Sequence, residues 1–206
     1  GPELRHSTIT LTGSLGRFAL GFVTSVMLAR LLGPSGYGLI ALVSLVLSIV
    51  DTLGDFGLTM SAVRAISRAL GPEPEHARRL AGAFFSLGLI ANSLAALGGI
   101  LLAGPIARVI LERPEAELYL RLAMIGLFSV AFNGFVTAVL QSLGRFGRLA
   151  AVQVLSAVTY LIGIVGLAVL DRLDIATVIL LGALNPLVGF VVGLRFLPPG
   201  FFSITE

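Results

Sequence analysis

The chain alternates between long apolar runs and short polar or charged stretches along most of its length. A helix needs about 20 predominantly apolar residues to cross a bilayer. Six runs reach that length, which predicts transmembrane helices at 9–32, 37–58, 80–103, 118–143, 149–170 and 175–197. Residues 1–8 form an N-terminal tail that starts with Gly1-Pro2, the remnant of a cleaved expression tag, and residues 198–206 form a C-terminal tail. The pattern predicts an all-α, polytopic membrane protein.

The predicted connections are short and rich in glycine, proline and charged residues. The stretch from Gly33 to Gly36 has the composition of a turn. Arg64 and Arg68 lie four positions apart between the second and third spans, which predicts a short helix lying at the membrane interface. The apolar stretch 106–111 is too short to cross, and we expect it to lie in the opposite interface.

The distribution of arginine indicates the orientation in the membrane. With a cytoplasmic N-terminus, eight arginines fall in inner segments and five in outer segments, leaving aside Arg17 within the first span. Cytoplasmic loops of membrane proteins carry an excess of positive residues. The count therefore predicts that both termini are cytoplasmic.

The composition limits the kinds of chemistry that the chain supports. Hydrophobic residues make up 56% of the sequence and charged residues 12%, which excludes a water-soluble enzyme and a disordered chain. The chain has no cysteine and only two histidines, so we expect no metal site, no cofactor and no enzymatic activity. The net charge of +3 comes from arginines at the edges of apolar runs, so we expect contact with membrane lipids and no binding of nucleic acid.

Arg17, Asp51 and Asp55 are charged residues within the predicted spans. Arg17 lies about 12 Å along the first helix, a depth at which a charge usually faces protein or a wet cavity. It is a candidate ligand of a phosphate group, with a structural, salt-bridged arginine as the alternative. Arg17 and Asp51 are equidistant from Pro34 along the chain, so the two are expected to pair. Asp55 shares a helical face with Asp51, and this pair of carboxylates is a candidate site for a coupling proton or sodium ion, with a solvated Asp55 as the alternative.

Other polar residues have more than one interpretation. Arg64 and Arg68 are expected to contact lipid headgroups, with substrate gating as the alternative. Asn92 and Asn133 are expected to form hydrogen bonds between helices, with a role in binding a ligand as the alternative.

Several motifs, in order along the chain, carry a family resemblance. The first runs from Leu28 to Gly38 (LARLLGPSGYG); three later ones are Asp55 to Leu58 (DFGL), Arg64 to Arg68 (RAISR) and Gln141 to Phe146 (QSLGRF). The sequence resembles the polysaccharide and lipid-linked oligosaccharide flippases of the multidrug/oligosaccharidyl-lipid/polysaccharide exporter superfamily. The first motif is the most specific, and the order of the others strengthens it.

The resemblance implies a transporter of the bacterial or archaeal cytoplasmic membrane. Members of this family carry two six-helix lobes and move lipid-linked sugars by alternating access. The six predicted spans are equivalent to one N-terminal lobe, with a second six-span lobe or a homodimer as the implied partner. The implied substrate is a polyprenyl-diphosphate-linked oligosaccharide, with Arg17 and Arg64 as candidate phosphate ligands. The alternatives are a lobe of an ion-coupled multidrug exporter and a structural membrane subunit without transport.

Overall fold

The computed structural model describes the backbone of residues 2–198 and the side chains of residues 15–198. The described elements are all helical: α1 (Pro2–Asp55), α2 (Leu58–Ala69), α3 (Pro74–Pro105), the π-helical turn η1 (Ile106–Ile110), α4 (Ala116–Ser142), α5 (Phe146–Val169) and α6 (Ile175–Leu194). The predicted all-α class is confirmed. The predicted N-terminal tail belongs to α1 from Pro2 onward, and the predicted C-terminal tail lies outside the described residues except for Pro198.

Within the described part of the chain, five helices are long and apolar enough to cross a membrane: Leu15–Asp55, Pro74–Ile110, Ala116–Ser142, Phe146–Val169 and Ile175–Leu194. The chain is therefore a multi-pass membrane protein. The first of these helices has 41 residues, far more than one crossing needs, and it covers most of both of the first two predicted spans.

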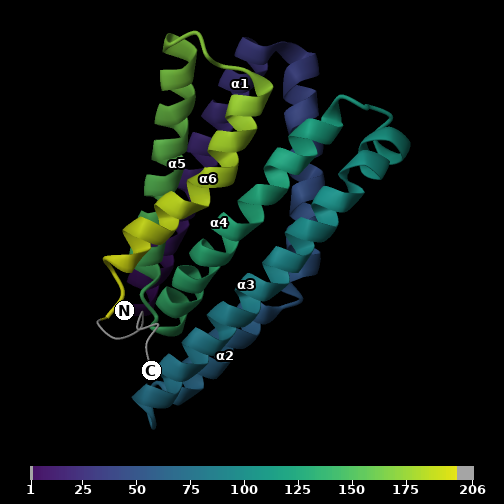
Figure 1. The fold of residues 1–206 in the computed structure, drawn as a ribbon. Coiled ribbons are helices and arrows are strands. Elements are labelled where there is room, and N and C mark those ends of the chain that lie inside the picture. Colours follow the sequence, from purple (N-terminus) through teal and green to yellow (C-terminus); the bar gives the residue numbers. More distant parts are fainter. Residues whose placement is uncertain (1, 199–206) are drawn as a thin grey trace.

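Gly33 divides α1 into two helical segments. Its φ of 71° and ψ of 171° lie outside the helical region, and glycine adopts a positive φ without a steric penalty. Pro34 then starts the next helical segment, where its missing N–H is not needed. In Figure 1 the chain rises in the segment before Gly33 and returns in the segment after it. The turn predicted over 33–36 is thus confined to one residue.

The short helix α2 packs against its neighbour in the sequence, α3. It packs alongside the first half of α3, so that the two helices form an antiparallel hairpin at one end of the molecule (Figure 1). Its buried face consists of Ala62, Ile66 and Ala69, which lie against α3 and α4. The predicted short helix is present and its apolar face is covered by protein, while its position at the membrane interface stays a prediction.

The segment 106–111 differs from the expectation. It does not form a separate interfacial piece but continues α3 as the wider turn η1, in which Leu111 N donates to Ile106 O at 2.9 Å. Pro105 lies at the junction and offers no N–H to the helical ladder. A π-helical turn accommodates such a local loss of the regular hydrogen-bond pattern.

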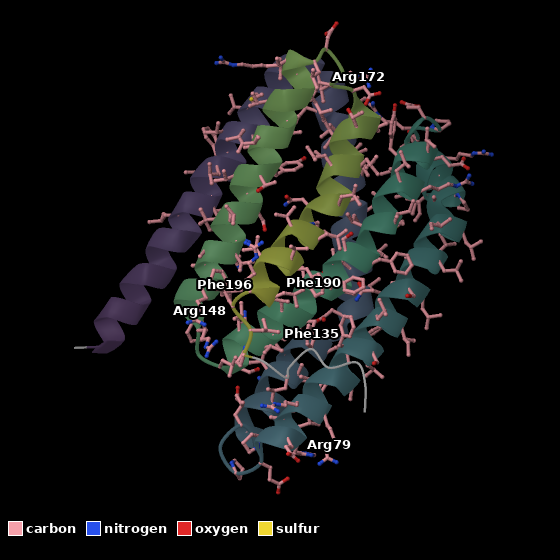
Figure 2. All side chains as sticks on the ribbon, turned by 60° about the vertical axis from the view of Figure 1, so that its left-hand side comes forward. Arg79, Phe135, Arg148, Arg172, Phe190 and Phe196 are labelled. Atoms are coloured by element: carbon pink, nitrogen blue, oxygen red, sulfur yellow. The ribbon has the colours of Figure 1, made fainter. Side chains whose placement is uncertain are left out.

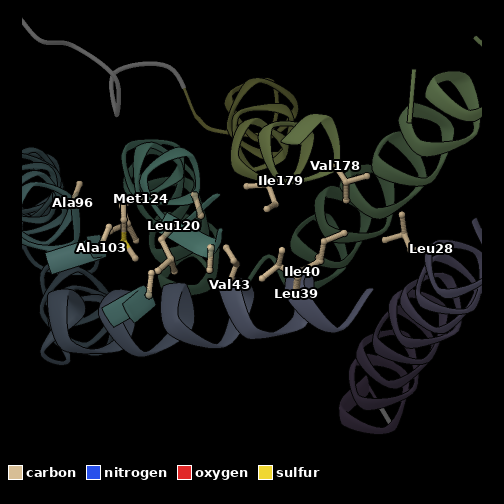
Figure 3. Close-up of a cluster of buried hydrophobic side chains, with 14 of the residues drawn as sticks. Leu28, Leu39, Ile40, Val43, Ala96, Ala103, Leu120, Met124, Val178 and Ile179 are labelled. Carbon is tan, nitrogen blue, oxygen red and sulfur yellow. The ribbon is translucent and has the colours of Figure 1, made fainter. Parts of the chain in front are cut away.

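The helix α4 lies in the centre of the bundle (Figure 1). In the most apolar 18-residue stretch of α4, 50% is buried inside the protein, against 11–22% in the corresponding stretches of the other long helices. One cluster of buried residues joins α4 to α1, α3 and α6 through Val43, Leu120, Met124 and Val178 (Figure 3). A second cluster joins the other half of α4 to α2 and the start of α3. The remaining helices expose apolar side chains, as expected where lipid is the solvent.

Candidate binding cavity

A cavity of about 480 Å³ lies between the end of α1, the start of α2, and the facing parts of α3 and α4. This volume falls within the range of about 300–1,000 Å³ that is typical of small-molecule sites. Its polar lining residues are Asp51, Thr52, Asp55, Thr59 and Asn92. Its aromatic lining residues are Phe84, Phe85 and Phe135. A cavity with an apolar wall and a few polar groups has the composition of a binding site.

The break between α1 and α2 lies at this cavity. Phe56 and Gly57 have φ values of 41° and 77°, which end α1 and redirect the chain into α2. Asp55 stabilises the new helix start, because its Oδ1 accepts hydrogen bonds from Thr59 Oγ1 at 2.6 Å and Thr59 N at 3.2 Å. The Asp55 carboxylate therefore occupies the N-terminus of α2, where a negative charge is favourable.

Asn92 is the most deeply buried polar residue of the cavity lining, with 7% of its surface exposed. Its Nδ2 donates to Gly88 O of the same helix at 2.9 Å, whereas its buried Oδ1 has no hydrogen-bond partner. The expectation that Asn92 bonds to another helix is therefore wrong. A buried acceptor without a donor costs free energy, so a partner that supplies a donor here is favoured.

Asp51 lines the same cavity one helical turn before Asp55. Its side chain is half-buried, and no protein donor reaches its carboxylate within the described residues. Asp51 and Asn92 come from α1 and α3, so the cavity brings together two acceptors that are 41 positions apart in the sequence.

The aromatic residues of the cavity lining belong to a longer series of rings in contact. The ring centroids of Phe85 and Phe135 are 4.9 Å apart, and the rings are tilted by 55°. Phe132 continues the contact, at 5.4 Å from Phe85 and 5.1 Å from Phe190. This series of rings joins α3, α4 and α6, and two of its members, Phe135 and Phe190, are labelled in Figure 2. Sequence reasoning did not single out these phenylalanines, since their spacing along three helices carries no common signal.

Arg17 lies away from the cavity. Its side chain is exposed, and its guanidinium lies 5.5 Å from the centroid of the Phe18 ring. No ion pair joins Arg17 to Asp51 in the side chains that the structure describes, so the expected pair is not formed. Two residues at equal sequence separation from the turn lie at a similar depth in the membrane, but their side chains need not point toward each other. The first segment of α1 instead packs on α5, where a Cβ at Gly16 would lie 3.9 Å from Val154.

Arg64 belongs to α2, a helix that lines the cavity, whereas the segment of α1 that carries Arg17 does not. It is exposed on α2 and follows Met60, a lining residue, by four positions. Residues four apart share a helical face, so Arg64 lies one turn beyond a residue of the cavity wall. Arg68 follows by another four positions and is exposed as well.

Two further arginines connect the α4–α5 turn to the chain after α6. Arg145 Nη1 and Arg148 Nη1 donate to Phe196 O at 2.9 Å and 3.3 Å. The Arg148 guanidinium also lies 5.9 Å from the centroid of the Phe196 ring (Figure 2). These contacts fix the two helix ends to each other.

At the opposite end, Glu117 bridges two arginines. It accepts from Arg108 at 3.0 Å and from Arg121 at 2.6 Å, which ties η1 to the start of α4. Both arginines are more than half exposed, so the bridge is worth little to stability. No group of three or more metal-ligating side chains occurs among the described residues.

Comparison with known proteins gives one match. A family model described as "Polysaccharide biosynthesis protein" matches residues 4–204, nearly the whole chain. No curated protein matches the chain, and neither does a solved structure.

Proposed function

The chain belongs to the polysaccharide biosynthesis protein family, the flippases of the multidrug/oligosaccharidyl-lipid/polysaccharide exporter superfamily, and on that premise we propose that it is one lobe of a lipid-linked oligosaccharide transporter. Members of this family are typically transporters rather than enzymes. The substrate is a polyprenyl-diphosphate-linked oligosaccharide, and the membrane is the cytoplasmic membrane of a bacterium or archaeon. The observation that carries the proposal is the cavity between α1, α2, α3 and α4, which is large enough for part of such a substrate.

The transport mechanism is alternating access. A second six-helix lobe, in the same polypeptide or in a second copy of this chain, forms the other side of the pathway. Rocking of one lobe against the other then exposes the cavity to each side of the membrane in turn. The two segments of α1 together with α3, α4, α5 and α6 give this lobe six crossings, with both termini in the cytoplasm.

Arg64 and Arg17 are the proposed ligands of the diphosphate. A guanidinium binds phosphate oxygens in a bidentate geometry, and the pairing strengthens where water is partly excluded. The position of Arg64, one turn beyond the lining residue Met60, supports it as the principal ligand. Arg17 lies on the exposed surface of the first segment, which suits contact with a diphosphate before it enters.

Asp51 and Asp55 are the proposed sites for a coupling proton or sodium ion. Asp55 accepts hydrogen bonds at the start of α2, whereas Asp51 receives none from the side chains and backbone that the structure describes. Asp51 is therefore the better candidate, and a coupling ion would compete there with the substrate.

The proposal is tested by binding of polyprenyl diphosphate and of a neutral polyprenol of equal length to the protein in lipid nanodiscs. We expect wild type to bind the diphosphate at least tenfold more tightly. Arg64→Gln removes a charge-assisted contact, so we expect it to lose about tenfold or more of the affinity for the diphosphate and none for the polyprenol. Arg17→Gln removes the second proposed ligand, and we expect it to lose less affinity for the diphosphate than Arg64→Gln does. Equal affinity of wild type for both lipids contradicts the proposed function.

A further inference from the structure

We propose that the cavity is a subsite for the sugar part of the substrate, selective for uncharged or amino sugars over acidic ones, while the diphosphate is held outside it. This inference rests on the proposed function and names which part of the lipid-linked substrate the cavity takes. It follows from the kinds of hydrogen-bonding groups that line the cavity, from their charges, and from the aromatic residues in the same lining.

The free polar groups of the lining are acceptors. Among the residues that the structure describes, Asn92 Oδ1 is buried without a partner and the Asp51 carboxylate receives no donor. The two lining hydroxyls already donate to the protein, Thr52 to Ser48 O at 2.8 Å and Thr59 to Asp55 at 2.6 Å. A ligand that satisfies these groups must therefore supply donors. Sugar hydroxyls and ammonium groups do so.

The same groups disfavour a phosphate. Phosphate oxygens at neutral pH are mainly acceptors and carry negative charge, so they need donors or cations. The lining contains two carboxylates and no arginine, lysine or histidine. The start of α2, which would otherwise attract an anion, is occupied by the Asp55 carboxylate. A diphosphate or a sugar carboxylate is thus repelled from the cavity.

The size and the wall of the cavity favour a sugar over a metal ion. A volume of about 480 Å³ is far larger than a single ion and is of the size that small-molecule sites have. Phe84, Phe85 and Phe135 add an apolar surface to the lining that carries the acceptors. A pyranose ring has hydroxyls at its edge and C–H groups on its faces, and both parts find a partner here.

The test compares three ligands of one lipid length in nanodiscs: polyprenyl diphosphate, the same lipid with one N-acetylhexosamine, and the same lipid with one hexuronic acid. We expect wild type to bind the N-acetylhexosamine form at least fivefold more tightly than the bare lipid, and the acid form no more tightly than the bare lipid. Asn92→Ala should remove most of the gain from the neutral sugar without changing the affinity for the bare lipid. Asp51→Asn should narrow the difference between the neutral and the acidic sugar.

Asn133→Ala is the matched control, because Asn133 also has a buried Oδ1 without a partner but does not line the cavity. It should leave all three affinities unchanged. If Asn92→Ala is not recovered as folded protein, Asp51→Asn decides the question alone. Equal binding of the bare and the N-acetylhexosamine lipids by wild type overturns the sugar subsite while leaving the proposed function intact. Failure to bind any of the diphosphate lipids overturns both. A third outcome also overturns the inference. In it, replacing choline with sodium raises the melting temperature of wild type but not of Asp51→Asn, and no sugar is preferred. The cavity is then a cation site.

Discussion

Asp55 and Thr59 close the break between α1 and α2, because the carboxylate accepts both the hydroxyl hydrogen bond of Thr59 at 2.6 Å and its backbone N–H at 3.2 Å. This contact holds the start of α2 against the cavity. It also gives Asp55 a structural task that is separate from any contact with an ion or a substrate.

We expect Asp55→Ala to lower the free energy of unfolding by about 1 kcal/mol, the usual cost of losing a side chain that caps a helix. For a chain of this size that corresponds to a fall in melting temperature of about 2–4 °C, measured in detergent. Asp55→Asn is the control, since asparagine caps a helix about as well as aspartate. A loss in Asp55→Asn equal to that in Asp55→Ala would show that the charge, rather than the capping bond, is what matters.

The close approach of α4 and α6 gives a second prediction. A Cβ added to Gly126 would lie 2.9 Å from both the Cα and the Cβ of Ala183, and the backbone of α6 cannot move aside cheaply. We expect Gly126→Ala to destabilise the protein by about 1–3 kcal/mol through overpacking. Gly98→Ala has open space around the new Cβ and should be neutral or stabilising, because alanine favours a helix more than glycine does. Equal melting temperatures for the two variants would show that the α4–α6 contact is looser than described.

The long helices could be predicted from the sequence, because the cost of burying polar groups in lipid leaves a local signal about 20 residues long. The spans at 118–143 and 149–170 correspond to α4 and α5 within three residues at each end. The turn at Gly33 was predictable for a similar reason, since glycine followed by proline is a local signal.

The composition of the cavity could not be predicted in the same way. Asn92 and Asp51 meet only because α3 and the second segment of α1 present particular faces to α4. The rotation of each helix about its own axis depends on packing, which a mostly apolar sequence specifies weakly. This is why Arg17 and Asp51, expected as a pair from their depth alone, lie on different faces. It is also why Asn92 was expected to bond to another helix.

The start of α6 predicts a dependence of stability on pH. Asp174 accepts from Thr177 N at 2.7 Å and caps the helix in a reciprocal arrangement with Thr177. Hydrogen bonding with Thr177, first from its side chain and then from its backbone N–H, holds the pKa of Asp174 below its ordinary value.

A carboxyl group with a lowered pKa in the folded state stabilises the protein above its ordinary pKa of about 4 and loses this effect as the pH falls through the lowered value. We therefore expect the melting temperature of wild type to fall faster than that of Asp174→Ala as the pH is lowered from 6 to 3. At neutral pH the variant should lose about 1 kcal/mol. Parallel pH profiles for the two proteins would contradict the role of this cap.

The orientation in the membrane is open to a direct test, since the sequence contains no cysteine. In Figure 1 the turn at Gly33 and the loop after η1 lie at one end of the bundle, and the α2–α3 and α4–α5 turns lie at the other. Single cysteines at Ser35 and Pro114 should react with a membrane-impermeant reagent added outside intact cells. Cysteines at Gly71 and Gly147 should react only after the membrane is permeabilised. The reverse pattern would invert the predicted topology.

Photo-crosslinking tests most directly the claim that this lobe binds a lipid-linked sugar in its cavity. A polyprenyl-diphosphate N-acetylhexosamine with a diazirine on the sugar is bound to the protein in nanodiscs, irradiated and mapped by peptide mass spectrometry. We expect labelled residues in α3 and α4 along the cavity, between Ala81 and Asn92 and between Val130 and Val139, and we expect excess unlabelled substrate to suppress the labelling. Labelling confined to the exposed face of α5, insensitive to competing substrate, would contradict the account.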